Sequence, residues 1–164
     1  MAHDHRPPTL DALGLVTALR AHVADLAAVP ARVQAPEHLP PLPAAVEVAA
    51  YRIALEALQN VAAHAHATSC VLRLSHDGST LTVEVEDDGV GIPAGHPVGL
   101  GLQSLAERAG ELGGVLTLDT GAGGTGTVVR ASLPCLPRRA PEPDPAGPLT
   151  PAGQTPEWRP GWLP

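Results

Sequence analysis

The sequence predicts an α+β fold, with helices packed on one face of a mixed, mostly antiparallel sheet. Two observations support this prediction. Some segments carry apolar residues at helical spacing, whereas others alternate apolar and polar residues around a turn. These segments follow one another in the order helix, strand, helix, hairpin, helix, hairpin. Helices that must cover one face of antiparallel hairpins are typical of a two-layer α/β sandwich.

The first half of the chain predicts two helices with a short strand between them. Residues 9–28 form the first helix, which Pro30 ends because proline cannot continue it. Residues 31–36 are a strand candidate. Residues 44–67 are rich in Ala and lack Gly and Pro, so they predict a long second helix. The apolar positions at helical spacing in the first helix are Leu13, Val16, Leu19 and Val23.

The second half predicts two hairpins with a helix between them. Residues 69–87 alternate apolar and polar residues on both sides of a central Asp-Gly, which is a hairpin turn signal. Residues 102–114 predict a helix that closes with two glycines. Residues 115–134 predict the last hairpin, with a wide glycine-rich loop.

Composition divides the chain into a lead at residues 1–8, a folded domain at 9–134 and a tail at 135–164. The tail is rich in proline and has no apolar period, so we expect it to be disordered. The domain is one unit, because 164 residues leave little for a second core.

Charge and composition argue against nucleic acid as a partner. The formal net charge is -7 and only 2% of residues are aromatic, whereas a nucleic-acid binder normally offers a basic face and stacking rings. The chain has no signal-peptide pattern and no membrane-spanning apolar run. We therefore expect a cytoplasmic protein.

Four clusters in the folded part carry candidate chemistry. Each has a simple structural explanation when taken alone: a solvated helix face, a turn, a helix entry or a hairpin loop. The clusters are Glu56 with Asn60, the run Asp87-Asp88-Gly89-Val90-Gly91, the run Gly99-Leu100-Gly101-Leu102, and the loop Gly123-Gly124-Thr125-Gly126-Thr127.

Together, the clusters indicate a nucleotide site. Gly99 and Gly101 at the start of a helix would let backbone N–H groups approach a phosphate. Asn60 offers an amide oxygen to Mg²⁺, which commonly bridges such a ligand and phosphate oxygens. The carboxylate of Asp87 would accept a hydrogen bond from an exocyclic amine, which selects adenine over guanine at that position. Glu56 lies one turn from Asn60, placed to orient or deprotonate a nucleophile near the terminal phosphate.

These stretches resemble a known family. "EALQNVAAHA", "DDGVGIP", "GLGL" and "GGTGT" look like the N, G1, G2 and G3 boxes of the gyrase/histidine-kinase ATPase superfamily, the Bergerat fold. Within it, "RPPTLDALGLVTAL" and "GLGLQSLAERAGELGGVL" look most like sensor histidine kinases of the nitrate-sensor and DesK-like type.

The resemblance implies a role for each matching residue. Asn60 would bind Mg²⁺ and Glu56 would be the general base. Asp87 would anchor adenine, and Gly89 and Gly91 would let the base approach closely. The other implied ATP-binding residues are His64, Gly99, Leu100, Gly101, Leu102, Thr125 and Thr127.

The resemblance also implies partners. The terminal phosphate would pass from ATP to a histidine on a dimerisation domain, and then to an aspartate on a response regulator. His3, His5 and His22 lack the surrounding pattern of the family's phosphoacceptor histidine. We therefore expect the acceptor on a domain that is absent from this chain, and the chain alone to be an inactive monomer.

One departure keeps an alternative open. The position three after Asn60 is commonly Lys or Arg in this subfamily, but here it is Ala63, so a positive partner for the triphosphate is missing. His64 could partly substitute, and a packing or capping role fits it equally. The alternative is a nucleotide-binding regulatory module without kinase activity. An ATPase of the gyrase or mismatch-repair type does not fit this length, and a Ser/Thr kinase of the anti-sigma type is a minor possibility.

Overall fold

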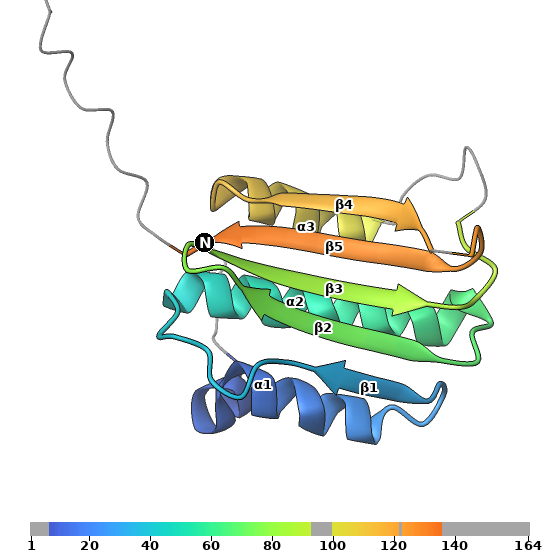
Figure 1. Cartoon of the computed structure of the whole chain (residues 1–164), viewed down its shortest axis with the longest axis horizontal. Coiled ribbons are helices and arrows are strands. Elements are labelled where there is room, and N and C mark those ends of the chain that lie inside the picture. Colours follow the sequence, from blue (N-terminus) through green and yellow to red (C-terminus); the bar gives the residue numbers. More distant parts are fainter. Residues whose placement is uncertain (1–6, 93–99, 122, 136–164) are drawn as a thin grey trace, which may run out of the picture.

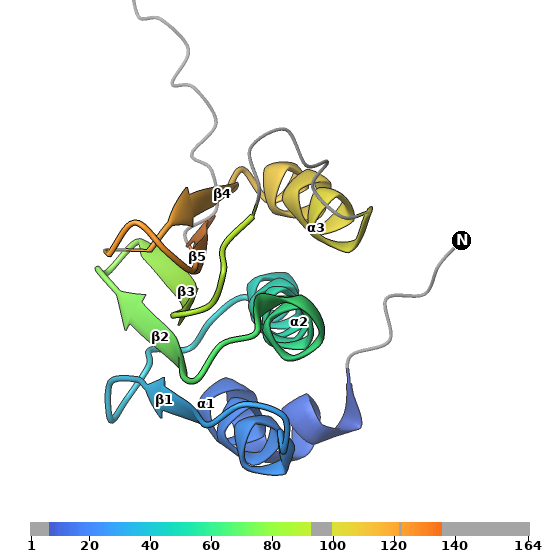
Figure 2. The same ribbon diagram turned by 90° about the vertical axis from the view of Figure 1, so that its right-hand side faces the viewer.

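The computed structural model describes residues 7–92, 100–121 and 123–135. The predicted lead up to residue 6, the tail beyond Cys135 and Gly99 lie outside the described residues. Figure 2 shows the described part edge-on, with helices α1, α2 and α3 on one side of a single sheet. The predicted two-layer α+β architecture is confirmed.

The sheet has five strands in the order β1-β2-β3-β5-β4. The short β1 pairs in parallel with β2, and every other pairing is antiparallel, as Figure 1 shows. Both predicted hairpins form, because β2 pairs with β3 and β4 with β5. The strands are β1 (Ala31–Gln34), β2 (Cys70–His76), β3 (Thr80–Asp87), β4 (Val115–Thr120) and β5 (Thr127–Pro134).

The helices bury small and aliphatic side chains against the sheet. They are α1 (Pro8–Asp25), α2 (Ala44–Asn60) and α3 (Leu100–Glu111). Helix α2 covers the centre of the sheet, and its buried positions include four alanines, which let the helix lie close to the strands. Within the described residues, no helix is long and apolar enough to cross a membrane.

Helix α1 departs from its predicted pattern at Gly14. This residue has φ 72° and ψ 168°, which are not helical, so α1 consists of two segments joined by a kink. The kink changes the direction in which the first segment points its side chains. Leu13, one of the apolar positions at helical spacing, is 47% exposed, whereas Leu15 is buried.

Helix α2 changes type directly after Asn60. Residues Val61–Ala65 form a π-helical turn, and His66 ends it in the left-handed conformation with φ 50°. The predicted helix through residue 67 therefore ends two residues earlier, at Ala65, and its last turn is π-helical and not α-helical. Single π-helical turns occur often at functional sites.

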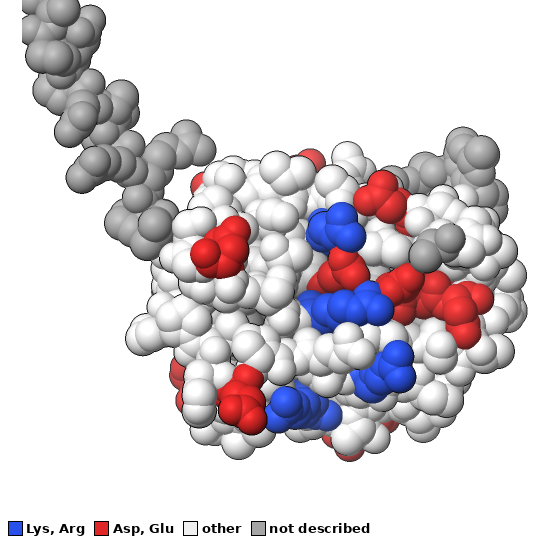
Figure 3. All heavy atoms as spheres, viewed as in Figure 1, with Lys and Arg blue, Asp and Glu red and all other residues white. Residues whose placement is uncertain are grey.

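The two faces of the sheet differ in polarity. The side under the helices carries buried Leu72, Val83 and Val85, and most of the neighbouring positions on the open side are polar, with Val71 as an exception. Figure 3 shows arginine and acidic side chains gathered on this open face. Arg73 on β2 and Arg130 on β5 both pair with Glu84 on β3, at 2.7 Å each.

Candidate active site

The predicted functional segments meet at one end of the molecule. Figure 1 shows the end of α2, the end of β3 and the connection between β4 and β5 on the same side. The topology explains this, since α2 and β3 both run towards this end and β5 starts from it. Clusters that are far apart in the sequence are therefore neighbours.

Asp87 is the buried carboxylate of this end. Its exposed fraction is 5%, and it is the only buried polar or charged residue among those the structure describes. Its Oδ1 accepts a hydrogen bond of 2.8 Å from the backbone N–H of Gly89. Burial raises the pKa of Asp87, and hydrogen bonds from the N–H groups of Gly89 and Thr127 oppose that shift. No arginine pairs with this carboxylate in the described part of the chain.

The loop before β5 closes directly on Asp87. Gly126 has φ 74°, and a Cβ built on it would overlap the backbone oxygen of Asp87. A Cβ on Gly91 would lie 3.0 Å from the oxygen of Gly126. The structure thus brings together Asp87, Gly91, Gly126 and the half-buried Thr127, whereas Thr125 is exposed.

Gly89 packs against the protein itself. A Cβ at this position would overlap the backbone oxygen of Ala65 in the π-helical turn, and the N–H of Val90 donates to that same oxygen at 2.9 Å. The segment after β3 is thereby fixed to the end of α2. A small residue is required here by the turn beneath it, independently of any bound base.

Asp88 has a structural role that the sequence analysis missed. Its carboxylate accepts four hydrogen bonds of 2.6–2.9 Å, from the N–H and hydroxyl groups of Thr68 and Ser69. These bonds hold the pKa of Asp88 well below its usual range, with the Thr68 hydroxyl as the largest cause. The predicted hairpin at residues 69–87 could have suggested this role. Its strands pair Cys70 with Asp87, which puts the residues before β2 beside those after β3.

Glu56 and Asn60 lie on one face of α2, as their spacing predicts. Both are half-buried, and neither side chain hydrogen-bonds or ion-pairs with a described residue. Glu56 lies against Gly101, in the first turn of α3, and both line a cavity of about 350 Å³ between the two helices. Two unpaired oxygen-bearing side chains one turn apart can take up a cation and a proton.

The remaining predicted residues are placed differently. His64 is exposed on the π-helical turn, next to the equally exposed Ala63. Leu100 begins α3, and the side chain of Leu102 is 5% exposed and belongs to the core. Contacts of His64, Leu100 and Leu102 with a nucleotide stay predictions. Among the described residues, no group of three His, Cys, Asp or Glu side chains could hold a metal ion.

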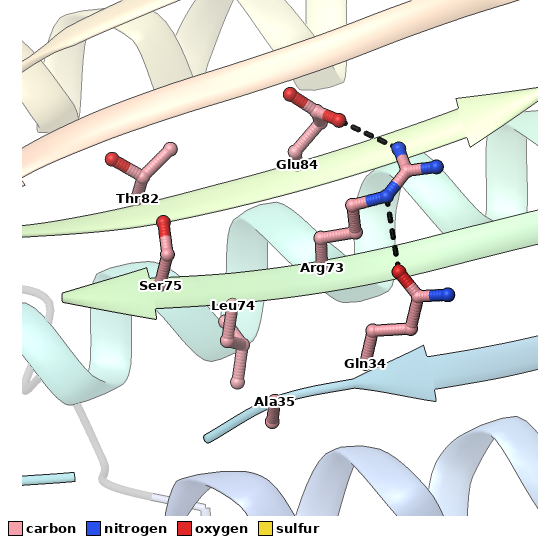
Figure 4. Close-up of a pocket in the computed structure, with 7 residues that line it drawn as sticks. All are labelled: Gln34, Ala35, Arg73, Leu74, Ser75, Thr82 and Glu84. Carbon is pink, nitrogen blue, oxygen red and sulfur yellow. Dashed lines mark hydrogen bonds and ion pairs between the residues drawn. The ribbon is translucent and has the colours of Figure 1, made fainter.

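A second hollow lies away from this end, on the open face of the sheet. Its volume is about 370 Å³, and Figure 4 shows the polar side chains that line it pointing towards one another. Arg73 bonds both to Gln34, at 3.2 Å, and to Glu84, at 2.7 Å. No predicted site residue lines this hollow, and its charged groups already satisfy each other.

Comparison with known proteins identifies the family. The model of the histidine kinase-, DNA gyrase B- and HSP90-like ATPases matches residues 45–137, more than half of the chain. The chain therefore belongs to this family. The predicted membership of the gyrase/histidine-kinase ATPase superfamily is confirmed.

Sensor histidine kinases are among the curated relatives. The chain is 33% identical over 133 residues to the sensor histidine kinase MctS of Rhizobium johnstonii, covering 76% of this chain and 29% of the relative. It is 39% identical over 88 residues to the signal transduction histidine-protein kinase/phosphatase UhpB of Salmonella typhimurium, covering 53% and 17%. The chain thus spans less than a third of either relative.

A solved structure agrees with the fold. The histidine kinase domain of the Erythrobacter litoralis EL346 blue-light activated histidine kinase superposes with a TM-score of 0.62 and 28% identity. The match covers 74% of this chain and 61% of that domain. The finer prediction of a nitrate-sensor or DesK-like type stays a prediction.

Proposed function

We propose that the chain binds Mg·ATP and transfers the terminal phosphate to a histidine on a separate domain, as the catalytic part of a sensor histidine kinase. The observation that carries this proposal is Asp87: a buried carboxylate with no arginine partner among the described residues, at the end of a strand and beside a glycine-rich loop. Placing an unpaired carboxylate there is costly, so it requires a compensating ligand.

Adenine would supply a further hydrogen-bond donor to the carboxylate of Asp87, beyond the N–H groups of Gly89 and Thr127. The exocyclic amine would donate to the carboxylate of Asp87, which favours its charged form and offsets the desolvation that raises its pKa. The hydroxyl of the half-buried Thr127 would add a polar contact to the same base. Guanine presents an oxygen where adenine presents its amine, so the carboxylate would repel it.

The side chain of Asn60 fits a magnesium ligand. It is an oxygen donor without a described partner, and it lies at the end of α2 next to the π-helical turn. Mg²⁺ is commonly held by one or two protein oxygens together with phosphate oxygens and water. When bound, the ion would neutralise charge on the phosphates during transfer.

Glu56 would act on the acceptor. Its carboxylate lies one turn from Asn60 and lines the cavity between α2 and α3. It would accept the N–H proton of the acceptor imidazole, or orient the ring, while the other ring nitrogen bonds to the terminal phosphorus. The bond from that phosphorus to the bridging oxygen breaks, and ADP leaves with the electron pair. Positioning of the two reactants would supply most of the remaining catalysis.

The partners follow from the relatives. MctS and UhpB are a sensor kinase and a signal transduction kinase/phosphatase, and this chain spans 29% and 17% of them. We assign the acceptor histidine to a dimerisation domain and the final acceptor aspartate to a response regulator. A cytoplasmic location and a monomeric state of the isolated chain belong to the same proposal.

One observation favours a second candidate function. Ala63 is exposed on the π-helical turn, where a cationic residue would reach the triphosphate. A module that binds the nucleotide and signals its occupancy, without transfer, would tolerate this loss. The two functions differ in what Glu56 does.

Calorimetric titration with a non-hydrolysable ATP analogue tests the proposal. We expect Mg²⁺-dependent binding to the wild type, and a loss of affinity of roughly 10- to 100-fold in Asp87→Asn, because a hydrogen bond to a buried charge is replaced by a neutral one. Absence of binding to the wild type would refute both functions.

Transfer from labelled ATP to a dimerisation domain supplied in trans then separates the two functions. The Glu56→Ala variant should keep its affinity for the analogue but transfer phosphate about 10²- to 10⁴-fold more slowly. Wild type that binds the analogue but labels no histidine would favour the regulatory module.

A further inference from the structure

The first turn of α3 and the middle of α2 approach each other unusually closely at one point. A Cβ built on Gly101 would overlap Oε1 of Glu56 and lie 2.6 Å from its Cδ. Carbon atoms in non-bonded contact lie about 3.5–4.0 Å apart, so no other residue type fits at 101 while Glu56 keeps this position. The close neighbour of Gly101 is thus the side chain of Glu56.

The overlap involves the flexible end of one side chain. The three atoms nearest to a Cβ at position 101, outside the helix's own backbone, are all carboxylate atoms of Glu56. A methyl group at 101 would therefore be accommodated by rotation of the glutamate, with the backbone of both helices in place. Substitution here moves the carboxylate without requiring a change of fold.

We propose that Gly101 is a positioning residue for Glu56. Because position 101 has no side chain, the carboxylate of Glu56 can lie against α3, and there it lines the cavity between α2 and α3. This inference rests on the proposed function, in which that carboxylate acts on the acceptor histidine. It adds to that function, because phosphate binding at a glycine-rich helix start does not explain why position 101 lies against the carboxylate of Glu56.

The cavity gives the carboxylate its surroundings. Arg52 on α2 and Arg108 on α3 carry the positive charges among its lining residues, and Glu56 is the only acidic one. A carboxylate displaced from Gly101 would move relative to both arginines. Its environment, and with it its carboxyl resonance, would change. The other lining residues are Leu55, Gln59, Ser104 and Leu105.

Helix α3 offers a matched control. Gly110 lies in the same helix, and a Cβ built on it meets no atom within 4 Å. The Gly110→Ala variant therefore makes the same chemical change without touching Glu56. Both variants also replace a helical glycine by the stronger helix former, so the intrinsic gain in helix propensity is common to them.

The first measurement is the carboxyl ¹³C resonance of Glu56 in the nucleotide-free chain, assigned with a Glu56→Gln variant. We expect a displaced resonance in Gly101→Ala and an unchanged one in Gly110→Ala. An unchanged resonance in Gly101→Ala would overturn the proposal. This spectrum needs no nucleotide, whereas failure of the wild type to bind the ATP analogue would refute the proposed function instead.

The second measurement is steady-state transfer to the dimerisation domain supplied in trans. We expect Gly101→Ala to lower kcat about 100-fold, since a displacement near 1 Å can cost that much, with KM for ATP within about threefold of the wild type. Adding Glu56→Asp, which shortens the side chain by one methylene, should recover part of kcat. A raised KM with unchanged kcat would assign Gly101 to phosphate binding and reject the positioning role.

Discussion

Strand β3 carries carboxylates in two regions that treat them in opposite ways. On the open face of the sheet, Glu84 lies between Arg73 and Arg130, and Glu86 pairs with Arg73 at 2.6 Å. At the end of the same strand, Asp87 is buried under the last loop, and its hydrogen-bond partners among the described residues are backbone N–H groups. On the open face each of these carboxylates has an arginine partner, whereas the carboxylate of Asp87 has no arginine partner among the described residues.

The pKa directions of the two regions express this difference. Burial alone would raise the pKa of Glu84, but hydrogen bonds from Arg130 and Arg73 outweigh it and hold the pKa below its usual range. Burial raises the pKa of Asp87, and its two N–H partners do not outweigh it. The open-face hollow is a pocket, but the charged groups that line it are paired with each other. A buried carboxylate whose desolvation the fold does not offset is therefore a clearer sign of a ligand site than a pocket is.

The largest expected loss of stability comes from adding a side chain at Gly126, which lies against the backbone oxygen of Asp87. Gly126→Ala adds a Cβ where φ is 74° and where the Asp87 backbone oxygen lies, so both the left-handed conformation and the overlap oppose it. We expect a loss of about 2–3 kcal/mol in the free energy of unfolding, measured by urea denaturation.

Gly124→Ala is the matched control for that variant. Gly124 lies in the same loop with φ 77°, but a Cβ there meets nothing within 4 Å. It should lose only the conformational contribution, about 1 kcal/mol. Equal losses in the two variants would mean that the loop does not press on Asp87.

The open-face region should respond less. Glu84→Ala removes both arginine contacts of a partly exposed side chain, and pairs of this kind contribute roughly 0.2–1 kcal/mol each. We expect a loss of about 1 kcal/mol in urea denaturation, reduced in 1 M salt because the pairs are screened.

Glu86→Ala tests whether the network is shared. Among the described residues Glu86 pairs with one arginine, Arg73, so its removal should cost about half as much as that of Glu84. A larger loss for Glu86→Ala would contradict the central place of Glu84 in the network.

Sequence reasoning did not reach the ion pairs of the open face, whereas it recognised the motifs of the family, and the difference has a physical reason. Alternation along β2, β3 and β5 gave the strands and their faces, but the partners of Arg73 depend on strand order, which alternation does not specify. The family motifs are short and consist largely of glycines and a few polar residues. Their order in the chain was therefore enough to recognise them.

The misplaced details share another cause. The kink at Gly14, the π-helical turn after Asn60 and the fixing of Asp88 by Thr68 and Ser69 all depend on backbone conformation that tertiary contacts decide. Intrinsic helix propensity does not separate an α-helical from a π-helical turn in an Ala-rich segment. Leu102 illustrates the same limit, because its motif suggested the ligand whereas its side chain packs in the core.

The smallest expected change in stability has the opposite sign, and it separates the two regions most clearly. A carboxyl whose pKa is raised in the fold binds more protons folded than unfolded, so it lowers stability as the pH rises from its unfolded pKa, about 3.9, through its folded pKa. Asp87→Asn keeps an oxygen for the Gly89 N–H but removes the charge. Its free energy of unfolding should match the wild type below that window and exceed it at neutral pH, while nucleotide affinity falls.

Glu84→Gln supplies the contrast for that experiment. The pKa of Glu84 is lowered in the fold, so its charge stabilises the protein above its unfolded pKa, and this contribution is lost as the pH falls through the folded value. Glu84→Gln should therefore be less stable than the wild type at neutral pH and approach it in acid. Urea denaturation from pH 3 to pH 7 measures both differences. If Asp87→Asn lost stability at neutral pH as Glu84→Gln does, the charge of Asp87 would be compensated within the fold, and its case as the adenine anchor would lose its physical basis.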